Sequence, residues 1–292
     1  MEWRLPRSGR RKKGVTFMPH YKLLKYPRTP HLEGSRLQPG DEDLSQIAFS
    51  SIAGKRIVVE EKCDGANTAI SFDGDGDLLL QSRGHYLTGG YRERHYNLMK
   101  QWANLHRNAF YSILGSRYIM YGEWMYAKHT VFYDNLPHYF LEFDVYDRAT
   151  DKFLDTPSRH ALLADLPVVS VPVLKIGAFN SLPELTDLIG QSKFIKEGHL
   201  GRLREYCEKN GESAEKRCGE TDPTTLMEGL YIKIEQDGEV IDRMKFVRAS
   251  FLQCVALSDS HWLNRSIVPN QLSYPLEEIF TPMRPNNGRY LF

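Results

Sequence analysis

The chain has 292 residues, 41% hydrophobic and 26% charged, which is enough to bury a core and excludes a disordered chain. Its 38 Lys and Arg balance 37 Asp and Glu, so the net charge of +1 offers no overall attraction to a polyanion, and nucleic-acid contacts would need locally focused charge. The sequence has no run of about 20 apolar residues, no signal-peptide core and no zinc-type spacing among its four cysteines, so we expect reduced thiols in a cytoplasmic protein.

The first 50 residues are expected to form an N-terminal extended segment. A basic run, Arg10 to Lys13, has no apolar periodicity and is either a solvated terminus or an arm that contacts phosphates. The stretch from Tyr21 to Gly40 is rich in Pro, Arg and Gly, which indicates an extended lead-in. It includes Tyr26 to His31, which could contact a nucleotide or RNA, but no chemical argument singles these residues out.

Strand patterns begin at Arg56. Residues 57–62 open with an apolar run and end on Lys62, residues 68–72 alternate as a second strand, and residues 78–81 form a third. The Asp-rich stretch 73–77 between the last two resembles a calcium loop, but it lacks the glycine at the sixth position and the distal Glu. It is therefore expected to be a hairpin turn.

The rest of the chain alternates between helical and strand patterns. A helix is predicted over 96–114, with Leu98, Trp102, Leu105 and Ala109 on one face. Together the patterns predict an α+β fold of antiparallel sheets flanked by helices, with a short helical C-terminal tail. Further strands are predicted at 118–121, 139–146, 229–235 and 240–246, and further helices at 158–163, 182–189, 201–209 and 249–263.

The main chemical signal is the sequence Glu61-Lys62-Cys63-Asp64-Gly65-Ala66-Asn67 at a strand end. A lysine amine attacks only when deprotonated, so we expect the site to depress the pKa of Lys62. The glycine would let the backbone approach a bound nucleotide. A lone KxDG string also fits a surface turn with a solvated lysine, so further motifs are needed.

Five more short motifs follow in order: Ser82-Arg83-Gly84, Tyr121-Gly122-Glu123-Trp124, Glu142-Phe143-Asp144, Glu228-Gly229-Leu230 and Arg243-Met244-Lys245. This order resembles the covalent nucleotidyltransferases, which comprise ATP-dependent DNA ligases, RNA ligases and messenger-RNA capping enzymes. The resemblance runs from about Ile57 to Phe251 and implies the nucleotidyltransferase (ATP-grasp-like ligase) fold. It divides the chain into residues 1–50, an adenylyltransferase domain over 51–251 and a short extension over 252–292.

Within that superfamily the chain most resembles the RNA ligase 2-type branch. Asn67 stands five positions after Lys62, where DNA ligases generally carry Arg, and Phe143 is placed as the adenine-stacking aromatic of that branch.

The resemblance implies a role for each motif residue. Lys62 would attack the α-phosphate of ATP, with Glu61 flanking it in the nucleotide site. Arg83 and Glu123 would hold the ribose and the incoming 5′-phosphate, and Phe143 would stack on adenine. Glu228 would lie beside Mg²⁺ or Mn²⁺, Arg243 and Lys245 would neutralise the α-phosphate, and Asn67 would position the RNA 5′ end. These assignments agree with the chemistry, because nucleotidyl transfer depends on positioning and charge stabilisation.

Two features qualify this interpretation. The last motif usually reads Lys-x-Lys, and here Arg243 occupies its first position; arginine is not interchangeable with lysine as a point donor. Each residue taken singly also has a structural explanation, since Glu123 and Glu228 could be ordinary strand-end carboxylates and Phe143 could be core.

The segment 85–100 interleaves aromatic residues with Arg92, Arg94 and Lys100. Such a pattern can bind single-stranded ends by stacking and phosphate contact, but it equally fits a surface loop that leads into a helix. Arg92 and Arg94 are the candidates here for nucleic-acid contacts, whereas the histidines of the chain have no ligand spacing and are expected to be structural.

The sequence thus predicts an ATP-dependent RNA ligase that forms lysyl-AMP and RNA-adenylate before joining a 3′-hydroxyl to a 5′-phosphate, in RNA repair and with an end-healing kinase or phosphatase as a possible partner. A DNA ligase or capping-type enzyme is the alternative within enzymes. The residues after Lys245 have a helical pattern. This disfavours a DNA ligase or capping-type enzyme, because DNA ligases commonly carry a β-barrel after the final motif. A catalytically inactive nucleic-acid-binding module is the alternative of another class.

Overall fold

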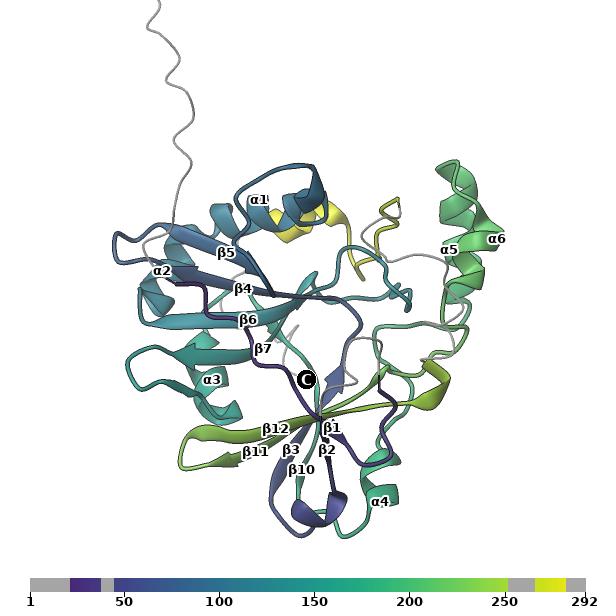
Figure 1. Ribbon diagram of the computed structural model, residues 1–292. Coiled ribbons are helices and arrows are strands. Elements are labelled where there is room, and N and C mark those ends of the chain that lie inside the picture. The colour runs from purple at the N-terminus through teal and green to yellow at the C-terminus, as the bar shows by residue number, and fades with distance from the viewer. Residues whose placement is uncertain (1–21, 38–44, 252–265, 282–292) are drawn as a thin grey trace, which may run out of the picture.

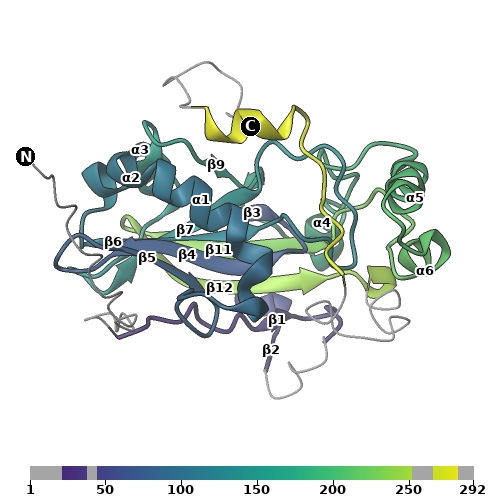
Figure 2. The ribbon, with the colours of Figure 1, turned by 90° about the horizontal axis from the view of Figure 1, so that it is seen from above.

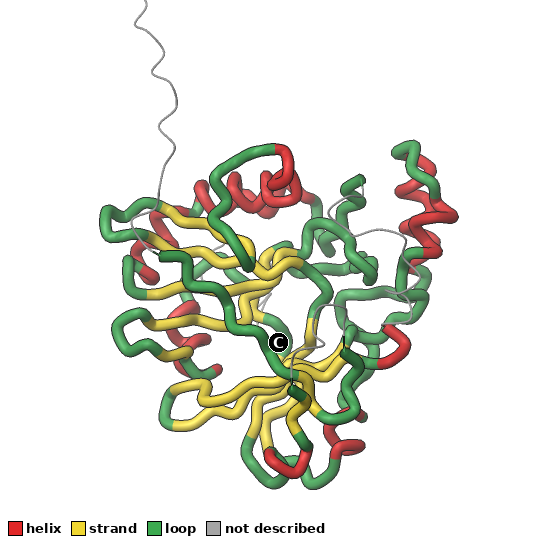
Figure 3. Tube along the Cα trace, viewed as in Figure 1, coloured by secondary structure: helices red, strands yellow, loops and turns green. Residues whose placement is uncertain are grey.

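A computed structural model describes residues 22–37, 45–251 and 266–281. These residues form two β-sheets with helices at their periphery, so the predicted α+β class is confirmed (Figures 1 and 3). The basic run 10–13, Cys254 and most of the predicted helix 249–263 lie outside the described residues. In the described ranges, no helix is long and apolar enough to cross a membrane.

The first sheet is built around β3, whose apolar start at Ile57 places it between two antiparallel partners. Its outer edge departs from the antiparallel prediction, because β1 pairs in parallel with both β12 and β2. Asp237 and Gly238 both have positive φ (52° and 86°), as the tight turn that joins β11 to β12 requires. The sheet order is β10 (Val173–Gly177), β3 (Ile57–Lys62), β11 (Gly229–Gln236), β12 (Glu239–Val247), β1 (His31–Leu32) and β2 (Gln46–Ile47).

The second sheet contains the hairpin that resembled a calcium loop. Asp73 Oδ1 accepts hydrogen bonds from the backbone N–H groups of Asp75 and Asp77, so its carboxylate closes the turn and the hairpin prediction is confirmed. The sheet order is β5 (Leu78–Ser82), β4 (Ala66–Phe72), β6 (Tyr118–Trp124), β7 (Phe140–Asp147) and β8 (Lys152–Phe153), with β9 (Val169–Ser170) parallel to β7.

The predicted helix 96–114 is divided in two at His106. Of its predicted buried face, Trp102 is fully buried and Leu98 and Ala109 pack against the core, but Leu105 is 55% exposed. The helix predicted over 182–189 ends at Thr186, and α6 was not predicted. The α-helices are α1 (Asn97–Leu105), α2 (Arg107–Leu114), α3 (Thr156–Leu163), α4 (Leu182–Thr186), α5 (His199–Lys209) and α6 (Ala214–Gly219), and the 3-10 helices are η1 (Phe49–Ser51), η2 (Tyr91–Tyr96) and η4 (Leu276–Phe280).

The first sheet has one apolar face and one polar face, because side chains alternate along a strand. On β3, Ile57 and Val59 join an apolar cluster with Leu185 of α4. Glu60 and Lys62 therefore share the opposite face, which is turned towards the second sheet.

A buried ion network joins the two sheets. Arg159 of α3 is 0% exposed and lies 2.6 Å from Glu60 of β3 and 3.3 Å from Glu142 of β7. Lys233 of β11 lies 2.9 Å from the same Glu60 and 3.1 Å from Asp144 of β7. Two cations thus pair with three carboxylates that approach from both sheets.

The C-terminal segment 266–281 packs on the outside of the second sheet, with η4 against α1 (Figure 2). Asn270 is 1% exposed and donates from its side chain to Met125 O, while its Oδ1 accepts from the backbone of Tyr133. These bonds attach the segment to the loops that follow β6.

Removing one member of the ion network should destabilise the fold strongly. We expect Arg159→Met to lower the free energy of unfolding by about 3–5 kcal/mol, because it leaves buried carboxylates without a partner. Urea denaturation measures this. The exposed pair Lys175–Glu184 provides the control, and Lys175→Met should cost less than about 1 kcal/mol. Equal effects of the two substitutions would contradict the central role of the network.

Candidate active site

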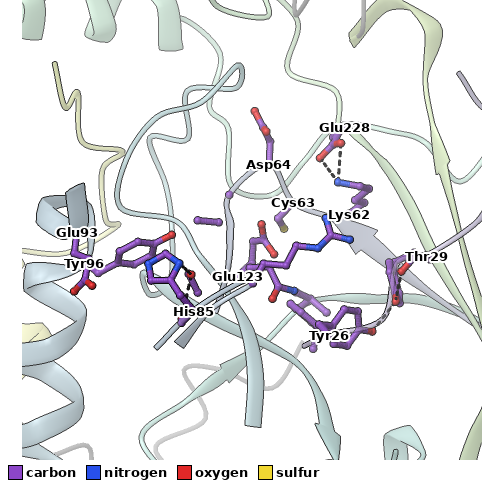
Figure 4. A pocket seen from close by; sticks show the side chains of 18 of the residues that line it. Tyr26, Thr29, Lys62, Cys63, Asp64, His85, Glu93, Tyr96, Glu123 and Glu228 are labelled. Atoms are coloured by element: carbon purple, nitrogen blue, oxygen red, sulfur yellow. Dashed lines mark hydrogen bonds and ion pairs between the residues drawn. The ribbon is translucent and has the colours of Figure 1, made fainter. Parts of the chain in front are cut away.

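A cavity of about 1510 Å³ lies between the two sheets and contains most of the predicted site residues. Figure 4 shows Lys62, Glu228 and Thr29 on one side, Glu93, Tyr96 and His85 on the other, and Glu123 between them. Both sheets and the N-terminal lead-in contribute to its walls. Of the predicted residues, Lys62, Glu61, Asn67, Arg83, Arg92, Arg94, Glu123, Phe143, Glu228 and Lys245 line the cavity.

Lys62 is held by Glu228 at the inner end of the cavity. Its Nζ lies 2.7 Å from Oε1 and 2.8 Å from Oε2 of Glu228, and the two side chains are 21% and 1% exposed. The contact follows from the pairing of β3 with β11, which sets Lys62 opposite Gly229. Lys245 lines the same cavity, and its charge tends to lower the pKa of Glu228.

The expectation of a depressed lysine pKa is wrong for this state of the protein. Burial alone would lower the pKa of Lys62, but the carboxylates of Glu228 and Glu123 outweigh it and hold the pKa above its ordinary value. Lys62 is therefore an ammonium group in the free protein. An ammonium group has no free lone pair, so this amine could attack an electrophile only after losing a proton.

The carboxylates around Lys62 are poised to titrate near neutral pH. Burial raises the pKa of Glu123 to about 8 and that of Glu228 to about 7, in both cases against the attraction of Lys62. Across the described ranges, no group of three potential ligands forms a ready metal centre. Mg²⁺ keeps several waters and binds through one or two protein carboxylates plus the phosphates of a substrate. Glu228 and Glu123 can supply these carboxylates.

The motif glycine has a packing role that the sequence did not indicate. A Cβ at Gly65 would lie 2.7 Å from Met125 Sδ and 2.8 Å from Glu123 Cγ, so only glycine allows β6 to come this close.

Asp64 holds the loop that covers this turn. Its Oδ2 accepts from the backbone N–H groups of Thr130 at 2.7 Å and Val131 at 2.8 Å. The hydroxyl of Tyr133 in turn accepts from the Asp64 backbone N–H. The acidic residue of the KxDG string therefore positions a loop that sequence reasoning did not connect to it.

Phe143 reaches the cavity through a β-bulge. The β6–β7 register passes from Tyr121–Asp144 to Gly122–Glu142, which leaves Phe143 without a partner on β6. A bulge of this kind redirects a side chain. The Phe143 ring packs edge-on against Tyr26 at 5.1 Å and lies 6.4 Å from Tyr231, so one end of the cavity is aromatic.

Two predicted residues are not placed as expected: Arg243 does not line the cavity, and Glu61 lines it but has its carboxylate bound elsewhere. Arg243 is not among the lining residues, because its guanidinium lies over Phe153 at 3.9 Å and Tyr26 at 5.2 Å. Glu61 alternates with Lys62 on β3, and its carboxylate accepts from Ser192 on the opposite face. There, burial raises the pKa of Glu61 to about 7.

The outer rim of the cavity carries the predicted basic residues. Arg83 stands at a tight turn in which the Ser82 N–H donates to His85 O, and its side chain is exposed. Arg94 stacks on Tyr91, whose ring is 80% exposed. Glu93 anchors this rim, because its carboxylate accepts from the backbone of Gly89 and pairs with Lys100.

Sequence patterns indicated no role for Tyr231, which lines the cavity, and they indicated a structural role for His85, although His85 lines the cavity as well. Tyr96, another lining residue, was singled out only as one of the aromatic residues of the segment 85–100. The residues Tyr26 to His31 had been noted without a chemical argument. The alternation of β11 could have suggested Tyr231, since it places Tyr231 on the face that carries Lys233.

Comparison with known proteins gives one family and one group of solved structures. The family model described as RNA ligase matches residues 55–247, which is more than half of the chain. A search of the curated proteins found no match to this chain.

Naegleria gruberi RNA ligase with PPi aligns at 18% identity and a TM-score of 0.48, over 79% of this chain and 57% of that one. One variant of that ligase with ATP and Mn aligns at 17% identity and a TM-score of 0.49, over 79% of this chain and 58% of that one. A second variant with ATP and Mn aligns at 16% identity and a TM-score of 0.47, over 73% of this chain and 54% of that one. The chain thus spans about half the length of these solved relatives.

A methyl group at the motif glycine should disturb the site. We expect Gly65→Ala to lower the free energy of unfolding by about 1–3 kcal/mol, because Met125 and Glu123 must move. Gly177→Ala on β10 is the matched control, since no atom lies within 4 Å of its added Cβ, and its change should stay within about 0.5 kcal/mol. Chemical denaturation of both variants decides the matter, and a harmless Gly65→Ala would refute the packing role.

Stability should depend on pH through Glu123. Its pKa is about 8 when folded, above its ordinary value, so protonation favours the folded state at low pH and this stabilisation is lost as pH rises through about 8. We therefore expect Glu123→Gln to gain stability relative to the wild type between pH 6 and pH 9, as measured by urea denaturation at each pH. The exposed Glu208→Gln should show a difference independent of pH. A flat profile for Glu123→Gln would contradict the raised pKa.

Proposed function

Because this chain belongs to the RNA ligase family, we propose that it is an ATP-dependent RNA ligase that carries AMP on Lys62. The observation that carries the proposal is the contact of the Lys62 amine with Glu228 inside a large cavity that also receives Lys245, Arg83 and Phe143.

The first step is attack of Lys62 Nζ on the α-phosphorus of ATP. A nitrogen–phosphorus bond forms, the bond to the β-phosphate oxygen breaks, and pyrophosphate leaves. Glu228 is in position to take the amine proton, and burial makes it a stronger base than an ordinary carboxylate. A divalent cation held by Glu228 and Glu123 would supply charge neutralisation at the phosphates, as Lys245 does from the side of the protein.

The later steps use the rest of the cavity. AMP passes from Lys62 to the 5′-phosphate of an RNA end, and a 3′-hydroxyl then displaces AMP to join the two ends. We assign the ribose and 5′-phosphate to Glu123 and Arg83, adenine to Phe143, and the RNA end to Asn67. The rim residues Arg92 and Arg94 extend a basic path outwards beside the exposed Tyr91 ring, which suits stacking of a single-stranded end.

The role first assigned to Arg243 is revised. Since its guanidinium covers Tyr26 and Phe153 and does not line the cavity, we assign phosphate neutralisation to Lys245 and a packing role to Arg243. Asn67 and Phe143 also support placement of the chain in the RNA ligase 2-type branch. In such a role it would act in RNA repair, after a kinase or phosphatase has prepared the ends.

Incubation with α-labelled ATP and Mg²⁺ or Mn²⁺ tests the nucleophile. The wild type should acquire acid-stable label. Lys62→Arg should acquire at least about a hundredfold less label than the wild type, because a guanidinium keeps the charge beside Glu228 but does not attack phosphorus. Thermal stabilisation by ATP should survive in Lys62→Arg, which separates loss of chemistry from loss of binding. Label on Lys62→Arg would disprove the assignment.

Substrate choice separates the proposed enzyme from its alternatives. Matched RNA and DNA nicks should be sealed with a preference for RNA. A preference for DNA would favour a DNA ligase, and labelling by GTP instead of ATP would favour a capping-type enzyme. A wild type that acquires no label but binds RNA would be a binding module without catalysis.

A further inference from the structure

A chain of three hydroxyl groups runs from the wall of the cavity to a buried carboxylate. Thr29 Oγ1 lies 3.1 Å from the Tyr231 hydroxyl, which lies 2.6 Å from the Tyr26 hydroxyl. The Tyr26 hydroxyl donates to Asp144 Oδ2. Thr29, Tyr231 and Tyr26 all line the cavity, whereas Asp144 is fully buried behind them.

The carboxylate end of this chain stays ionised. Asp144 Oδ1 lies 3.1 Å from Lys233 Nζ within the ion network that joins the sheets. Burial alone would raise the pKa of Asp144, but Lys233 and Arg243 outweigh it and hold the pKa below its ordinary value. An ionised carboxylate only accepts hydrogen bonds.

An acceptor at one end fixes the direction of the whole chain, because each hydroxyl has a single proton. The proton of Tyr26 points to Asp144, so the Tyr26 oxygen accepts the proton of Tyr231. The Tyr231 oxygen then accepts from Thr29. No other hydrogen bond of the Thr29 hydroxyl joins it to the described part of the chain, so its remaining capacity towards the cavity is to accept.

The surroundings of Thr29 suit a nucleobase. The Tyr231 and Phe143 rings have centroids 6.4 Å apart and are inclined by 36°, which offers aromatic surface to a planar group. Figure 4 shows Thr29 and Tyr26 on the Lys62 side of the cavity. Lys62, Thr29 and Phe143 line the same cavity, so a nucleotide whose α-phosphate meets Lys62 would place its base in the cavity that Thr29 lines.

We propose that Thr29 Oγ1 is an oriented acceptor that selects the exocyclic amino group of adenine, and this inference rests on the proposed use of ATP. Guanine carries a carbonyl oxygen at the corresponding edge, which is itself an acceptor and would leave two lone pairs facing each other. The buried ion network thereby determines nucleotide choice through Tyr26 and Tyr231, without touching the nucleotide.

Transfer of label from ATP and from purine riboside triphosphate, which lacks the amino group, tests the proposal. The wild type should favour ATP by about 2- to 10-fold in kcat/KM, the range expected for one neutral hydrogen bond. Thr29→Val should remove this preference, because it should slow the transfer of label from ATP and leave transfer from purine riboside triphosphate unchanged. Thr29→Ser should restore the preference. Tyr26→Phe should also weaken the preference, because Tyr231 is then free to turn its proton elsewhere.

The controls remove buried hydroxyls that are remote from the cavity. Thr156→Val loses a hydrogen bond to Glu235, and Tyr139→Phe loses one to Asn270 O, and both should keep the wild-type preference. A preference that survives in Thr29→Val, or one that is absent from the wild type, overturns the proposal. If Thr29→Val instead narrows the preference for ATP over 2′-deoxy-ATP, Thr29 contacts the ribose and the assignment to adenine is wrong.

Failure of the proposed function is distinguishable from failure of this inference. If the wild type acquires no label from any nucleotide, the ligase assignment fails. Calorimetric affinities for ATP and purine riboside triphosphate, compared between the wild type and Thr29→Val, then decide the role of Thr29. Equal ratios of these affinities in the two proteins would refute it.

Discussion

The buried pairing of Arg159 and Lys233 with three carboxylates is the constraint on which the site depends. Glu60 belongs to the first sheet, and Glu142 and Asp144 belong to the second, so neither sheet can shift without separating buried charges. Three of the proposed functional residues lie one or two positions from this network. Lys62 follows Glu60 by two residues, Phe143 stands between Glu142 and Asp144, and Tyr231 precedes Lys233 by two.

This arrangement explains how a site made from distant segments can be held together. A strand presents alternate residues on one face, so a charge anchored in the interior fixes the direction of its neighbour two positions on. Where alternation would turn a side chain away, the chain uses a bulge, as at Phe143. The glycine at Gly65 then allows β6 to bring Glu123 against the turn that follows Lys62.

The electrostatics of the site favour a resting state with a charged lysine. Glu228 and Glu123 stabilise the Lys62 ammonium, while burial raises the pKa values of both carboxyl groups towards neutrality. In the proposed reaction, the arrival of a divalent cation would favour loss of the ammonium proton, and Glu228 would accept that proton. The nucleophile would therefore be protected until nucleotide is bound, which suits a group that must not react with other electrophiles.

Local sequence patterns determined most of the strands and the motif residues of the cavity. The apolar start of β3, the Asp-rich turn and the Asp-Gly turn between β11 and β12 all act over a few residues, so they can be recognised without knowledge of the rest of the chain. The motif spacing likewise predicted that Lys62, Glu228 and Lys245 would meet. Only the tertiary structure decided that Arg243 covers Tyr26, that Glu61 turns towards Ser192, and that Thr29 ends a chain of hydroxyls. These outcomes depend on which distant segments come into contact and on which partner satisfies each buried charge, and no local pattern encodes that choice.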